Sequence, residues 1–424
     1  MKATLRSARR PITALALVLF LEAGAPAATL YVNVNNTTPV SPFTNWAGAA
    51  QVIQDAVDAA QAGDTVLVTN GVYGTGGRAV FGTMTNRVAV TKAVTVRSVN
   101  GPAVTQILGY QMPGTTNGDG AIRCAYLTNA ATIIGFTLAN GATHDGPWDD
   151  VRNYCGGGVF CESGGAFLTD CLLAGNSATG YGGAVYLGTL KHCTLVGNNA
   201  YAGGGAFGAS LDDCILIGNS AGEGGGTLGG ALNNCTLAAN YGFDAGGGAN
   251  SSKLTNSILY YNESSNYHGP TFNHVFCILE YCCTMPRPVG TSNVTNAPSF
   301  VDTNGWSNLR LQINSPCINA GNNAYVTNTT DQDGNPRIVN GTVDMGAFEW
   351  QVPVRLAALA PPGPDGLPLS LTGETNRVYA LHASSNLTTW SWLAWLTNSS
   401  GQSTYTDSLS PLPPARFYKA LPIP

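Results

Sequence analysis

Charged side chains are scarce in this chain. Lys, Arg, Asp and Glu make up 10% of its 424 residues, against about 25% in an average soluble domain. The net charge is −5 at pH 7 and no basic stripe is present, so the composition gives no case for a nucleic-acid partner or a membrane surface. Glycine is abundant instead, with 53 residues. This balance suits rows of stacked side chains, because like charges placed directly above one another repel.

Residues 155–262 lack the apolar spacing of a helix and contain a short, fixed repeat instead. One cysteine and one asparagine recur with steps of 22, 21, 21 and 22 residues, and a serine takes the fifth cysteine position. Such a period predicts a supersecondary unit that buries its apolar face by stacking on its copies. The two columns are Cys171, Cys193, Cys214, Cys235 and Ser257, and Asn176, Asn198, Asn219, Asn240 and Asn262.

The repeat phrase L-x-[DNH]-C-x-L-x-x-N alternates apolar and other residues with the period of a β-strand. This alternation directs Cys171 and Leu173 to one face and Asp170 and Leu172 to the other. The glycine pairs of each copy would break a helix, yet they suit tight corners. Each repeat is therefore predicted to form one coil of a parallel β-helix, with equivalent residues about 4.8 Å apart.

Both columns have a structural interpretation. The asparagines predict a ladder of side-chain amides that satisfies backbone groups at a corner, and a ligand-binding role is the alternative. The cysteines predict buried thiols packed as small hydrophobic groups, because stacked side chains strain the torsion angle of a disulfide. Cys155 with Cys161, and Cys277, Cys282 and Cys283, are placed outside the column and stay candidates for bridges. Metal binding is less favoured, since Cys282 and Cys283 lack a C-x-x-C spacing.

The phrases GNSATGYGGAV and GNNAYAGGGAF resemble repeats of bacterial polymorphic outer-membrane proteins and of right-handed β-helix proteins of the pectate-lyase-like superfamily. The resemblance covers residues 155–262 and implies the fold, because these repeats encode corners and core rather than chemistry. The segment IQDAVDAAQAGDTVLVTNGVY is similar to the start of many domains of this superfamily. Its apolar stripe at helical spacing predicts a helix that covers the open end of the core, within an N-terminal cap at residues 28–65.

Residues 1–27 have the features of a secretory signal peptide: basic residues, the apolar run ITALALVLFL, and the small-residue site Ala25-Pro26-Ala27. A retained membrane anchor is the alternative. The run is too short to span a bilayer, and no sortase-type motif or terminal apolar span follows, so we expect no membrane span after cleavage. The expected localisation is secreted, extracellular or at the bacterial cell surface.

Residues 296–350 depart from the repeat and contain SPCINAG, DQDGNPR and DMGAFE. These motifs closely resemble the terminal segment of the bacterial choice-of-anchor families, which implies exported surface architecture rather than catalysis. Within them Asp331, Asp333 and Asn335 are metal candidates, because alternating oxygen ligands around a glycine suit calcium. A turn pinned by Arg337 is the alternative.

Residues 351–363 are rich in Pro and Ala and predict a linker. Residues 364–424 alternate like short antiparallel strands and predict a small β-sandwich-like module. Its Trp390, Trp392 and Trp395 are candidates for stacking on sugars, with burial in a core as the alternative. The complete fold class predicted is all-β: a right-handed parallel β-helix of roughly ten coils over residues 28–350. We expect a cap helix at its N-terminal end, the anchor-type segment of residues 296–350 as the cap of its other end, and then this C-terminal module.

The polar insertion ATHDGPWDDVRNYC is the main candidate for a binding site, because loops that protrude from a rigid solenoid often carry function. Tyr181, Tyr201 and Phe243 precede later glycine corners on what is expected to be the same edge, where an aromatic row suits a carbohydrate chain. A loop without function is the alternative. The predicted ligand-binding residues are His144, Asp145, Trp148, Arg152, Tyr154, Tyr181 and Tyr201.

The candidate catalytic residues are Asp149, Asp150, Lys191 and Asp213. An outward column of Asp170, His192, Asp213, Asn234 and Asn256 sets two carboxylates about 9.6 Å apart, near the upper end of the spacing in inverting glycosidases. Lys191 could act as the base of a lyase, with an ordinary corner lysine as the alternative. The G-H-G and R-x-K motifs of polygalacturonase-like hydrolases are missing, as is a complete acid, base and calcium set. An apolar strip on the same face, from Leu172 to Ile258, predicts that a loop or the C-terminal module covers it.

The sequence leads to two hypotheses about function. The first is a structural, adhesin-like protein that acts as a monomer, has a glycan or cell-surface partner, and needs no cofactor other than a candidate calcium ion. The second is a polysaccharide lyase or glycoside hydrolase that acts in a groove beside residues 143–155.

Overall fold

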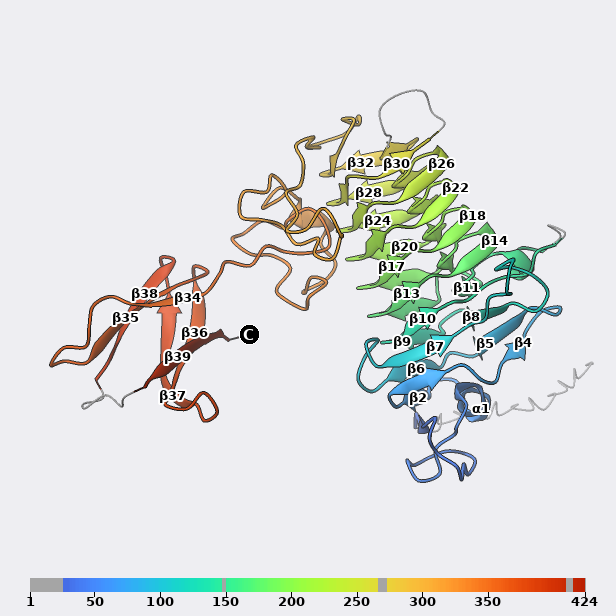
Figure 1. Cartoon of the computed structure of the whole chain (residues 1–424), viewed down its shortest axis with the longest axis horizontal. Coiled ribbons are helices and arrows are strands. Elements are labelled where there is room, and N and C mark those ends of the chain that lie inside the picture. Colours follow the sequence, from blue (N-terminus) through green and yellow to red (C-terminus); the bar gives the residue numbers. More distant parts are fainter. Residues whose placement is uncertain (1–25, 147–149, 266–272, 409–414, 424) are drawn as a thin grey trace, which may run out of the picture.

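The structure is a computed structural model, and it describes residues 26–146, 150–265, 273–408 and 415–423. The described residues form a stack of parallel coils, an irregular segment beside it and a small antiparallel module (Figure 1). The predicted parallel β-helix is thus confirmed. Its strands align into three long sheets, and five of the later coils add a fourth, shorter sheet.

The four sheets of the β-helix are named A to D here. Sheet A comprises β1 (Thr29–Val32), β2 (Thr65–Val68), β6 (Thr95–Ser98), β9 (Thr132–Ile134), β12 (Phe167–Thr169), β16 (Thr189–Lys191), β20 (Ser210–Asp212), β24 (Ala231–Asn233), β28 (Lys253–Thr255) and β32 (Ile278–Glu280). Sheet B comprises β3 (Gly71–Tyr73), β7 (Thr105–Leu108), β10 (Thr137–Ala139), β13 (Leu172–Ala174), β17 (Thr194–Val196), β21 (Ile215–Ile217), β25 (Thr236–Ala238), β29 (Ile258–Leu259) and β33 (Cys283–Thr284).

Sheet C comprises β4 (Arg78–Ala79), β5 (Thr85–Val90), β8 (Ile122–Leu127), β11 (Val159–Cys161), β15 (Val185–Tyr186), β19 (Ala206–Phe207), β23 (Thr227–Leu228), β27 (Ala249–Asn250) and β31 (His274–Val275). Sheet D comprises β14 (Ser177–Tyr181), β18 (Asn199–Ala202), β22 (Ser220–Glu223), β26 (Tyr241–Ala245) and β30 (Glu263–Ser264). Neighbouring strands run parallel except at the end of sheet C, where β4 is antiparallel to β5. The ten strands of sheet A agree with the coil number predicted from the repeat.

The cysteine column lines the interior, as predicted. Cys193, Cys214 and Cys235 are fully buried, and all eleven cysteines are free thiols. Each thiol of the column donates to the carbonyl two residues earlier, as Cys214 does to Asp212 at 3.3 Å. The Ser257 hydroxyl makes the same bond to Thr255 at 2.7 Å, which explains why serine fits the fifth position.

One cysteine predicted to lie outside the column belongs to it. Glu280 pairs in register with Thr255, so Cys282 lies above Ser257, and its thiol donates to the Glu280 carbonyl at 3.3 Å. The coil between Ser257 and Cys282 is longer than the others, and this shift in spacing hid the residue from the sequence pattern.

The asparagine column forms the predicted amide ladder. Each side-chain N–H₂ donates to the side-chain oxygen of the next asparagine, for example from Asn198 to Asn219 at 2.8 Å. The same oxygen accepts the backbone N–H of Asn198 at 3.0 Å, and Asn198 also donates to the Leu173 carbonyl at 3.0 Å. The ladder continues from Asn262 to Asn273 at 3.0 Å. These bonds satisfy corner backbone groups inside a dry core.

The outward column of acidic and amide residues marks the corners between sheets A and B. Its members, Asp170, His192, Asp213, Asn234 and Asn256, all have φ between 47° and 53°. This left-handed conformation is tolerated best by Asn, Asp and His among residues with a side chain. The residue types at this column are therefore explained by the turn that the backbone makes there.

The N-terminal end of the core is covered as predicted. Helix α1 (Ile53–Ala59) buries Ile53, Ala56 and Val57 in the main core cluster. The buried Gln54 amide accepts the backbone N–H of Ala89 at 2.7 Å, which joins the helix to β5. Among the described residues, no helix has the length and apolar character needed to cross a membrane.

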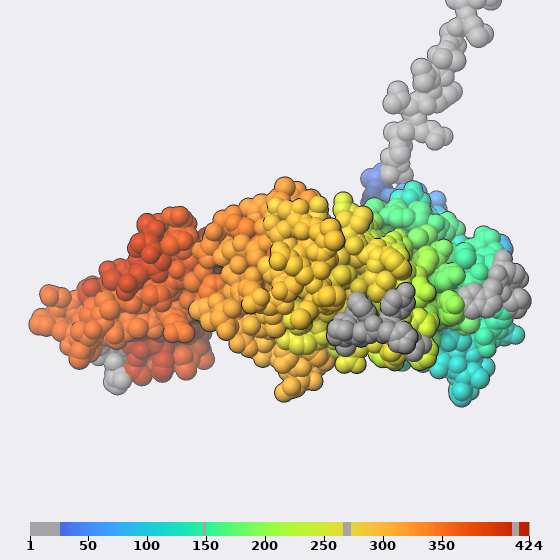
Figure 2. All heavy atoms as spheres, turned by 90° about the horizontal axis from the view of Figure 1, so that it is seen from above, coloured from blue at the N-terminus to red at the C-terminus, as the bar shows by residue number. Residues whose placement is uncertain are grey.

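Residues 296–350, named the terminal segment, lie along the side of the β-helix rather than across its end (Figures 1 and 2). The segment contains one short helix, η1 (Asn323–Tyr325). Its Phe300, Leu311 and Met345 pack on the outer residues Ile215 and Ile258 of sheet B. The cover predicted for the apolar strip is thus present, and the terminal segment provides it.

The C-terminal module has two three-stranded antiparallel sheets that enclose a small core. The first contains β34 (Arg355–Ala358), β35 (Leu367–Thr372) and β38 (Gln402–Asp407), and the second β37 (Ser391–Asn398), β36 (Arg377–Ser384) and β39 (Phe417–Pro422). Leu371, Tyr379 and Leu381 are buried between them. Strand β34 lies within the stretch predicted as a linker, because residues 355–358 pair with β35.

Candidate functional site

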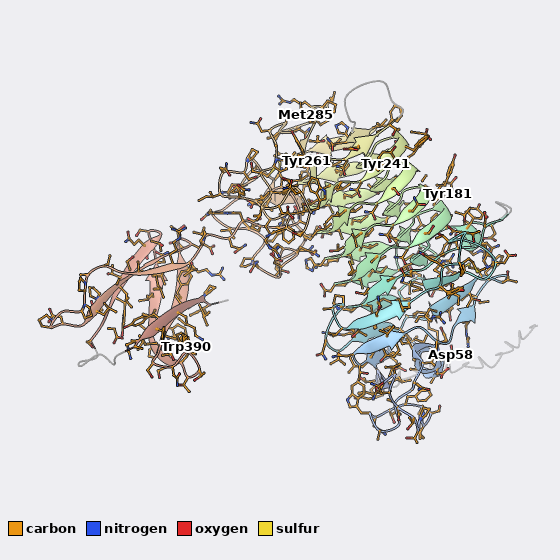
Figure 3. The ribbon with its side chains drawn as sticks, in the orientation of Figure 1. Asp58, Tyr181, Tyr241, Tyr261, Met285 and Trp390 are labelled. Atoms are coloured by element: carbon orange, nitrogen blue, oxygen red, sulfur yellow. The ribbon has the colours of Figure 1, made fainter. Side chains whose placement is uncertain are left out.

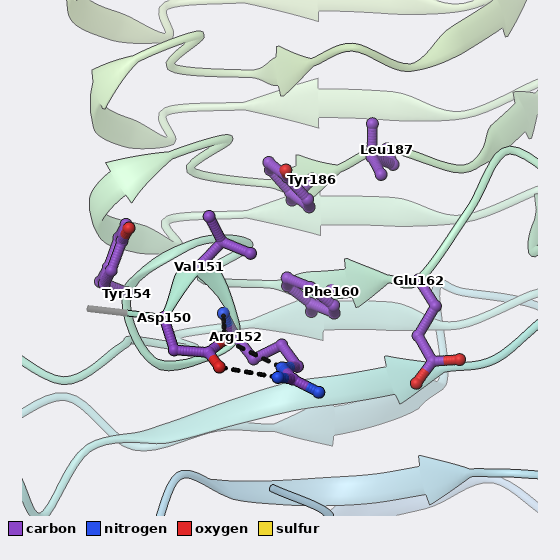
Figure 4. A pocket seen from close by; sticks show the side chains of 8 residues that line it. All are labelled: Asp150, Val151, Arg152, Tyr154, Phe160, Glu162, Tyr186 and Leu187. Carbon is purple, nitrogen blue, oxygen red and sulfur yellow. Dashed lines mark hydrogen bonds and ion pairs between the residues drawn. The ribbon is translucent and has the colours of Figure 1, made fainter. Parts of the chain in front are cut away.

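The insertion between β10 and β11 borders a cavity of about 520 Å³ on the outer face of sheet C (Figure 4). Helix α2 (Val151–Tyr154) lies on one side of it. The cavity is lined by Asp150, Val151, Arg152, Tyr154, Phe160, Glu162, Tyr186 and Leu187. It is named the sheet C cavity here.

The floor of the cavity is formed by Phe160 and Tyr186, which belong to a longer aromatic column. Parallel register places Tyr126, Phe160, Tyr186 and Phe207 at equivalent positions of successive coils. Their ring centroids are 5.4, 5.1 and 5.4 Å apart, and the planes are inclined by 15° or less. Stacked rings of this kind give a rigid apolar surface with little side-chain entropy to lose on binding.

A doubly bonded ion pair stands over this floor. The Arg152 guanidinium donates to both carboxylate oxygens of Asp150, at 2.9 and 2.7 Å, and lies 3.4 Å from the ring centroid of Phe81. Asp150 also caps α2 by accepting the backbone N–H of Arg152 at 2.9 Å. The hydrogen bonds from Arg152 lower the pKa of Asp150, so this carboxylate is ionised and oriented.

Glu162 faces the same cavity from the end of β11. Its carboxylate accepts a hydrogen bond from the Tyr126 hydroxyl. Burial, together with this bond to the carboxylate, raises the pKa of Tyr126, so the phenol stays protonated as a donor. Figure 4 shows the Glu162 carboxylate across the floor from the Asp150 and Arg152 pair.

A buried arginine holds the insertion in place. Arg123 on β8 has no exposed surface, and it donates to the carbonyls of Gly156, Arg152 and Cys155 at 2.7, 2.7 and 2.8 Å. Its remaining partner is the Asn86 side chain at 2.7 Å. Burial lowers the pKa of Arg123 to about 10, so it carries its charge at neutral pH. Arg123 is therefore a positioning residue for α2.

The predicted residues of the insertion have different surroundings. Asp150, Arg152 and Tyr154 meet at the cavity, and the buried Tyr154 ring packs so closely on Gly180 that a Cβ there would lie 2.4 Å from it. His144 is buried, and burial lowers its pKa; its side-chain Nε2 has no partner in the described structure. Asp145 is exposed. Trp148 and Asp149 lie outside the described residues.

The predicted aromatic edge lies on sheet D, next to the cavity. Tyr181 stacks on Phe207 with ring centroids 4.6 Å apart, and it meets Tyr201 edge to face at 6.4 Å. Tyr201 and Phe243 are 62% and 54% exposed, on β18 and β26 of the same sheet. Figure 3 shows Tyr181 and Tyr241 along one edge of the stack. Sheets C and D thus share a continuous aromatic surface through Phe207.

Two of the candidate catalytic residues, Lys191 and Asp213, do not line the sheet C cavity. Lys191 ends β16 on sheet A, in register with Asp212, and Asp213 is fully buried beneath the terminal segment. His192 lies between the two aspartates of the corner column, 3.5 Å from Asp170 and 3.8 Å from Asp213. The terminal segment thus covers Asp213, while Asp170, the other carboxylate that the sequence suggested for hydrolysis, stays exposed.

The candidate calcium residues organise a turn. Asp331 accepts the backbone N–H groups of Asp333 and Asn335 at 3.0 and 2.8 Å with one oxygen, and that of Glu349 at 3.0 Å with the other. Asp333 forms an ion pair with Arg310. Within the described ranges, no three His, Cys, Asp or Glu side chains are grouped closely enough to hold a metal ion. This geometry matches the alternative interpretation of DQDGNPR as a turn.

The sequence did not point to four residues that line the cavity, which are Phe160, Glu162, Tyr186 and Leu187, or to Arg123, which holds the insertion from within the core. A signal was present, because an aromatic residue follows the glycine corner in three successive coils, at Phe160, Tyr186 and Phe207. No pattern in the sequence shows that Glu162 and the insertion face the same space.

No protein-family profile matches the chain, and no curated protein matches it. Among solved structures, it is similar to pectate lyase Pel9A, with 14% identity and a TM-score of 0.44 over 77% of this chain and 97% of that one. It is also similar to pectin methylesterase PemA from Erwinia chrysanthemi, with 12% identity and a TM-score of 0.31 over 61% of this chain and 80% of that one. A rhamnogalacturonan lyase shows 10% identity and a TM-score of 0.32 over 61% and 68%. At such identities the likeness concerns the fold and says nothing about the chemistry of this chain.

Proposed function

We propose that this chain is a secreted or cell-surface β-helix protein with a structural, adhesin-like role, and that it binds a glycan as a monomer in the sheet C cavity. The observation that supports this most directly is the meeting of an apolar floor with a few oriented polar groups. Phe160 and Tyr186 supply the floor, and the Asp150 and Arg152 pair and Glu162 surround it. Sugars present both apolar C–H faces and hydroxyls, and sites of this composition suit them.

Binding is favoured over catalysis by how the polar groups are engaged. Both oxygens of Asp150 are held by Arg152, and the lowered pKa makes Asp150 a poor general acid. Arg152 is fixed by this pair and by its contact with Phe81. Such groups can orient a ligand without exchanging protons with it.

A polysaccharide lyase or glycoside hydrolase is the alternative, and Glu162 is the observation that favours it. This carboxylate faces the aromatic floor, and its residue is exposed. The Tyr126 hydroxyl donates a hydrogen bond to this carboxylate and orients it. If the protein is such an enzyme, Glu162 is its general acid or general base.

The test is a polysaccharide array probed with the full chain, followed by Kd measurements on the polymer that binds. We expect Tyr186→Ala and Arg152→Ala each to weaken binding about tenfold or more. Tyr110→Ala, which removes an exposed ring from the loop after β7, is the matched control and keeps the wild-type Kd. Unchanged binding by Tyr186→Ala, or no binding by the wild type, would overturn the proposal.

Release of new reducing ends or unsaturated products separates the two functions. Binding without such products supports the adhesin-like role. Cleavage that Glu162→Gln abolishes while the Kd stays within about threefold supports the enzyme.

A further inference from the structure

The C-terminal module exposes two neighbouring tryptophans that the sheet C cavity does not use. Trp392 and Trp395 on β37 are 53% and 58% exposed. Their ring centroids lie 5.7 Å apart, with the planes inclined by 56°. The module core is built by other side chains, among them Leu371, Tyr379 and Leu381, so the two indoles do not hold the fold together. Adjacent exposed apolar rings of this size mark a contact surface.

The strand register shows which residues share this face. Trp392 is paired with His382 of β36, which is paired with Lys419 of β39. Residues directly opposite each other in antiparallel strands project from the same side of the sheet. A second row is formed in the same way by Trp395, Ala380 and Leu421. The sheet irregularity between Leu381 and His382 brings Trp392 and Trp395 to one side although they are three residues apart.

Lys419 is oriented at this face. Its Nζ lies 4.4 Å from the ring centroid of Trp390, and the Trp390 indole N–H donates to the Leu387 carbonyl at 3.1 Å. The cation is thus held at the edge of the tryptophan pair, with hydrogen-bond donors to spare, since an ammonium group has three.

The acidic groups of the module lie elsewhere. Residues 351–424 contain three carboxylate side chains. Glu374 forms an ion pair with Arg377, and Asp407 with Arg416, while Asp365 is in the turn between β34 and β35. The ammonium group of Lys419, with His382 beside it in the same row, therefore makes this face complementary to an anion.

We propose that this face binds a polysaccharide that carries carboxylate groups. Its sugar rings would lie against Trp392 and Trp395, and its carboxylates would accept a charge-assisted hydrogen bond from Lys419 and a hydrogen bond from the His382 ring. The inference adds a second contact site to the proposed function, and it rests on that function for the glycan class of the partner. Two sites on one chain would bind a long polymer more tightly than either alone.

Affinity electrophoresis of the full chain in native gels tests the proposal. Polygalacturonate and alginate are the carboxylate probes, and dextran and methylcellulose are the neutral ones. We expect retardation by a carboxylate polymer, and at least a tenfold loss of affinity in the double variant Trp392→Ala/Trp395→Ala. Lys419→Gln should weaken binding less and reduce its dependence on salt. The matched control is Phe276→Ala, which removes an aromatic ring that is 80% exposed on the β-helix.

Three results would overturn the proposal: no retardation by either carboxylate polymer, equal retardation by the neutral polymers, or unchanged retardation of the double variant. A shift to a dimer in size-exclusion chromatography that the double variant abolishes would also overturn it, because the face would then bind a second copy. Tyr186→Ala distinguishes the two sites. If the Tyr186→Ala variant is still retarded and the tryptophan double variant is not, the polymer binds to the C-terminal module. The proposal for the sheet C cavity is then wrong, and the proposal for the module is supported.

Discussion

Asp213 and Arg337 form an ion pair with 3.2 Å between Oδ1 and Nε, and neither side chain is more than 1% exposed. Asp213 lies at a corner of the β-helix, and Arg337 belongs to the DQDGNPR motif of the terminal segment. Arg337 also lies 3.7 Å from Glu349 and donates to the carbonyls of Asp344 and Gly346. One buried guanidinium thus joins the terminal segment to the coils.

The first prediction concerns this guanidinium. Arg337→Ala should lower the free energy of unfolding by about 3–5 kcal/mol, because it leaves buried carboxylates without their cation. Urea denaturation followed by circular dichroism measures the loss. Arg310→Ala is the control: its pair with Asp333 is at the surface, and its loss should cost less than about 1 kcal/mol. Equal losses of stability in the two variants would contradict the role of Arg337 in joining the terminal segment to the coils.

The second prediction concerns pH. Burial raises the pKa of Asp213 and Asp344 to about 6 and that of Glu349 to about 8, while the unfolded chain has ordinary values near 4. The folded protein therefore keeps protons that the unfolded chain has released. The stabilisation that these carboxyl groups provide is fully present below about pH 4. It is lost as the pH rises through their pKa values in the folded protein.

The free energy of unfolding should thus be higher at pH 5 than at pH 8 by at least about 1 kcal/mol. His192 acts in the same direction, because its hydrogen bond with Asp170 raises its pKa. Glu349→Gln should flatten the part of the profile above pH 6. A wild-type profile that is flat, or that rises between pH 5 and 8, would show that these carboxylates are ionised when folded.

The fold could be predicted because its repeat is local. The spacing of the cysteine and asparagine columns determines which residues stack, and the amide ladder follows from that spacing alone. The corner column shows the limit of this reasoning. Its Asp, His and Asn residues resemble a catalytic set in sequence, yet a single backbone conformation with positive φ explains them.

The third prediction tests the ladder with two adjacent residues. Asn198→Ala should destabilise the protein by at least about 2 kcal/mol, because it removes the buried side-chain hydrogen bonds that Asn198 makes with Asn176, Asn219 and Leu173. Asn199→Ala is the matched control, since its exposed amide donates to Ser220 on the outer face, and it should change stability by less than about 0.5 kcal/mol. A similar small effect for both would mean that the ladder adds no stability.

The candidate site could be predicted in part. The insertion was recognised from its polarity, and Asp150, Arg152 and Tyr154 do meet at a cavity. Glu162 and Arg123 were not recognised, since their roles depend on how coils stack and on which side the insertion folds. The side-on packing of the terminal segment likewise depends on contacts between distant residues, such as Asn322 with Asn256.

The fourth prediction concerns the thiols. Burial raises the pKa of Cys171, Cys193 and Cys214, so a thiol reagent at pH 8 should leave them unmodified in the folded protein. In denaturant without reductant, the reagent should count all eleven cysteines. A lower count that reductant restores would reveal bridges, and mass spectrometry of unreduced peptides would identify them.

The fifth prediction concerns the residue that positions the site. Arg123→Met keeps an unbranched apolar stem beside Phe160 but removes the hydrogen bonds to Arg152, Cys155 and Gly156. The freed insertion should expose the peptide bond after Arg152, so trypsin should cleave there about tenfold faster, since local opening sets the rate. Arg87→Met is the control, because this buried arginine donates to the Leu108 and Gly76 carbonyls instead. If trypsin cleaves this bond at the same rate in both variants, α2 is held by its own packing. Arg123 then stabilises the core without positioning α2.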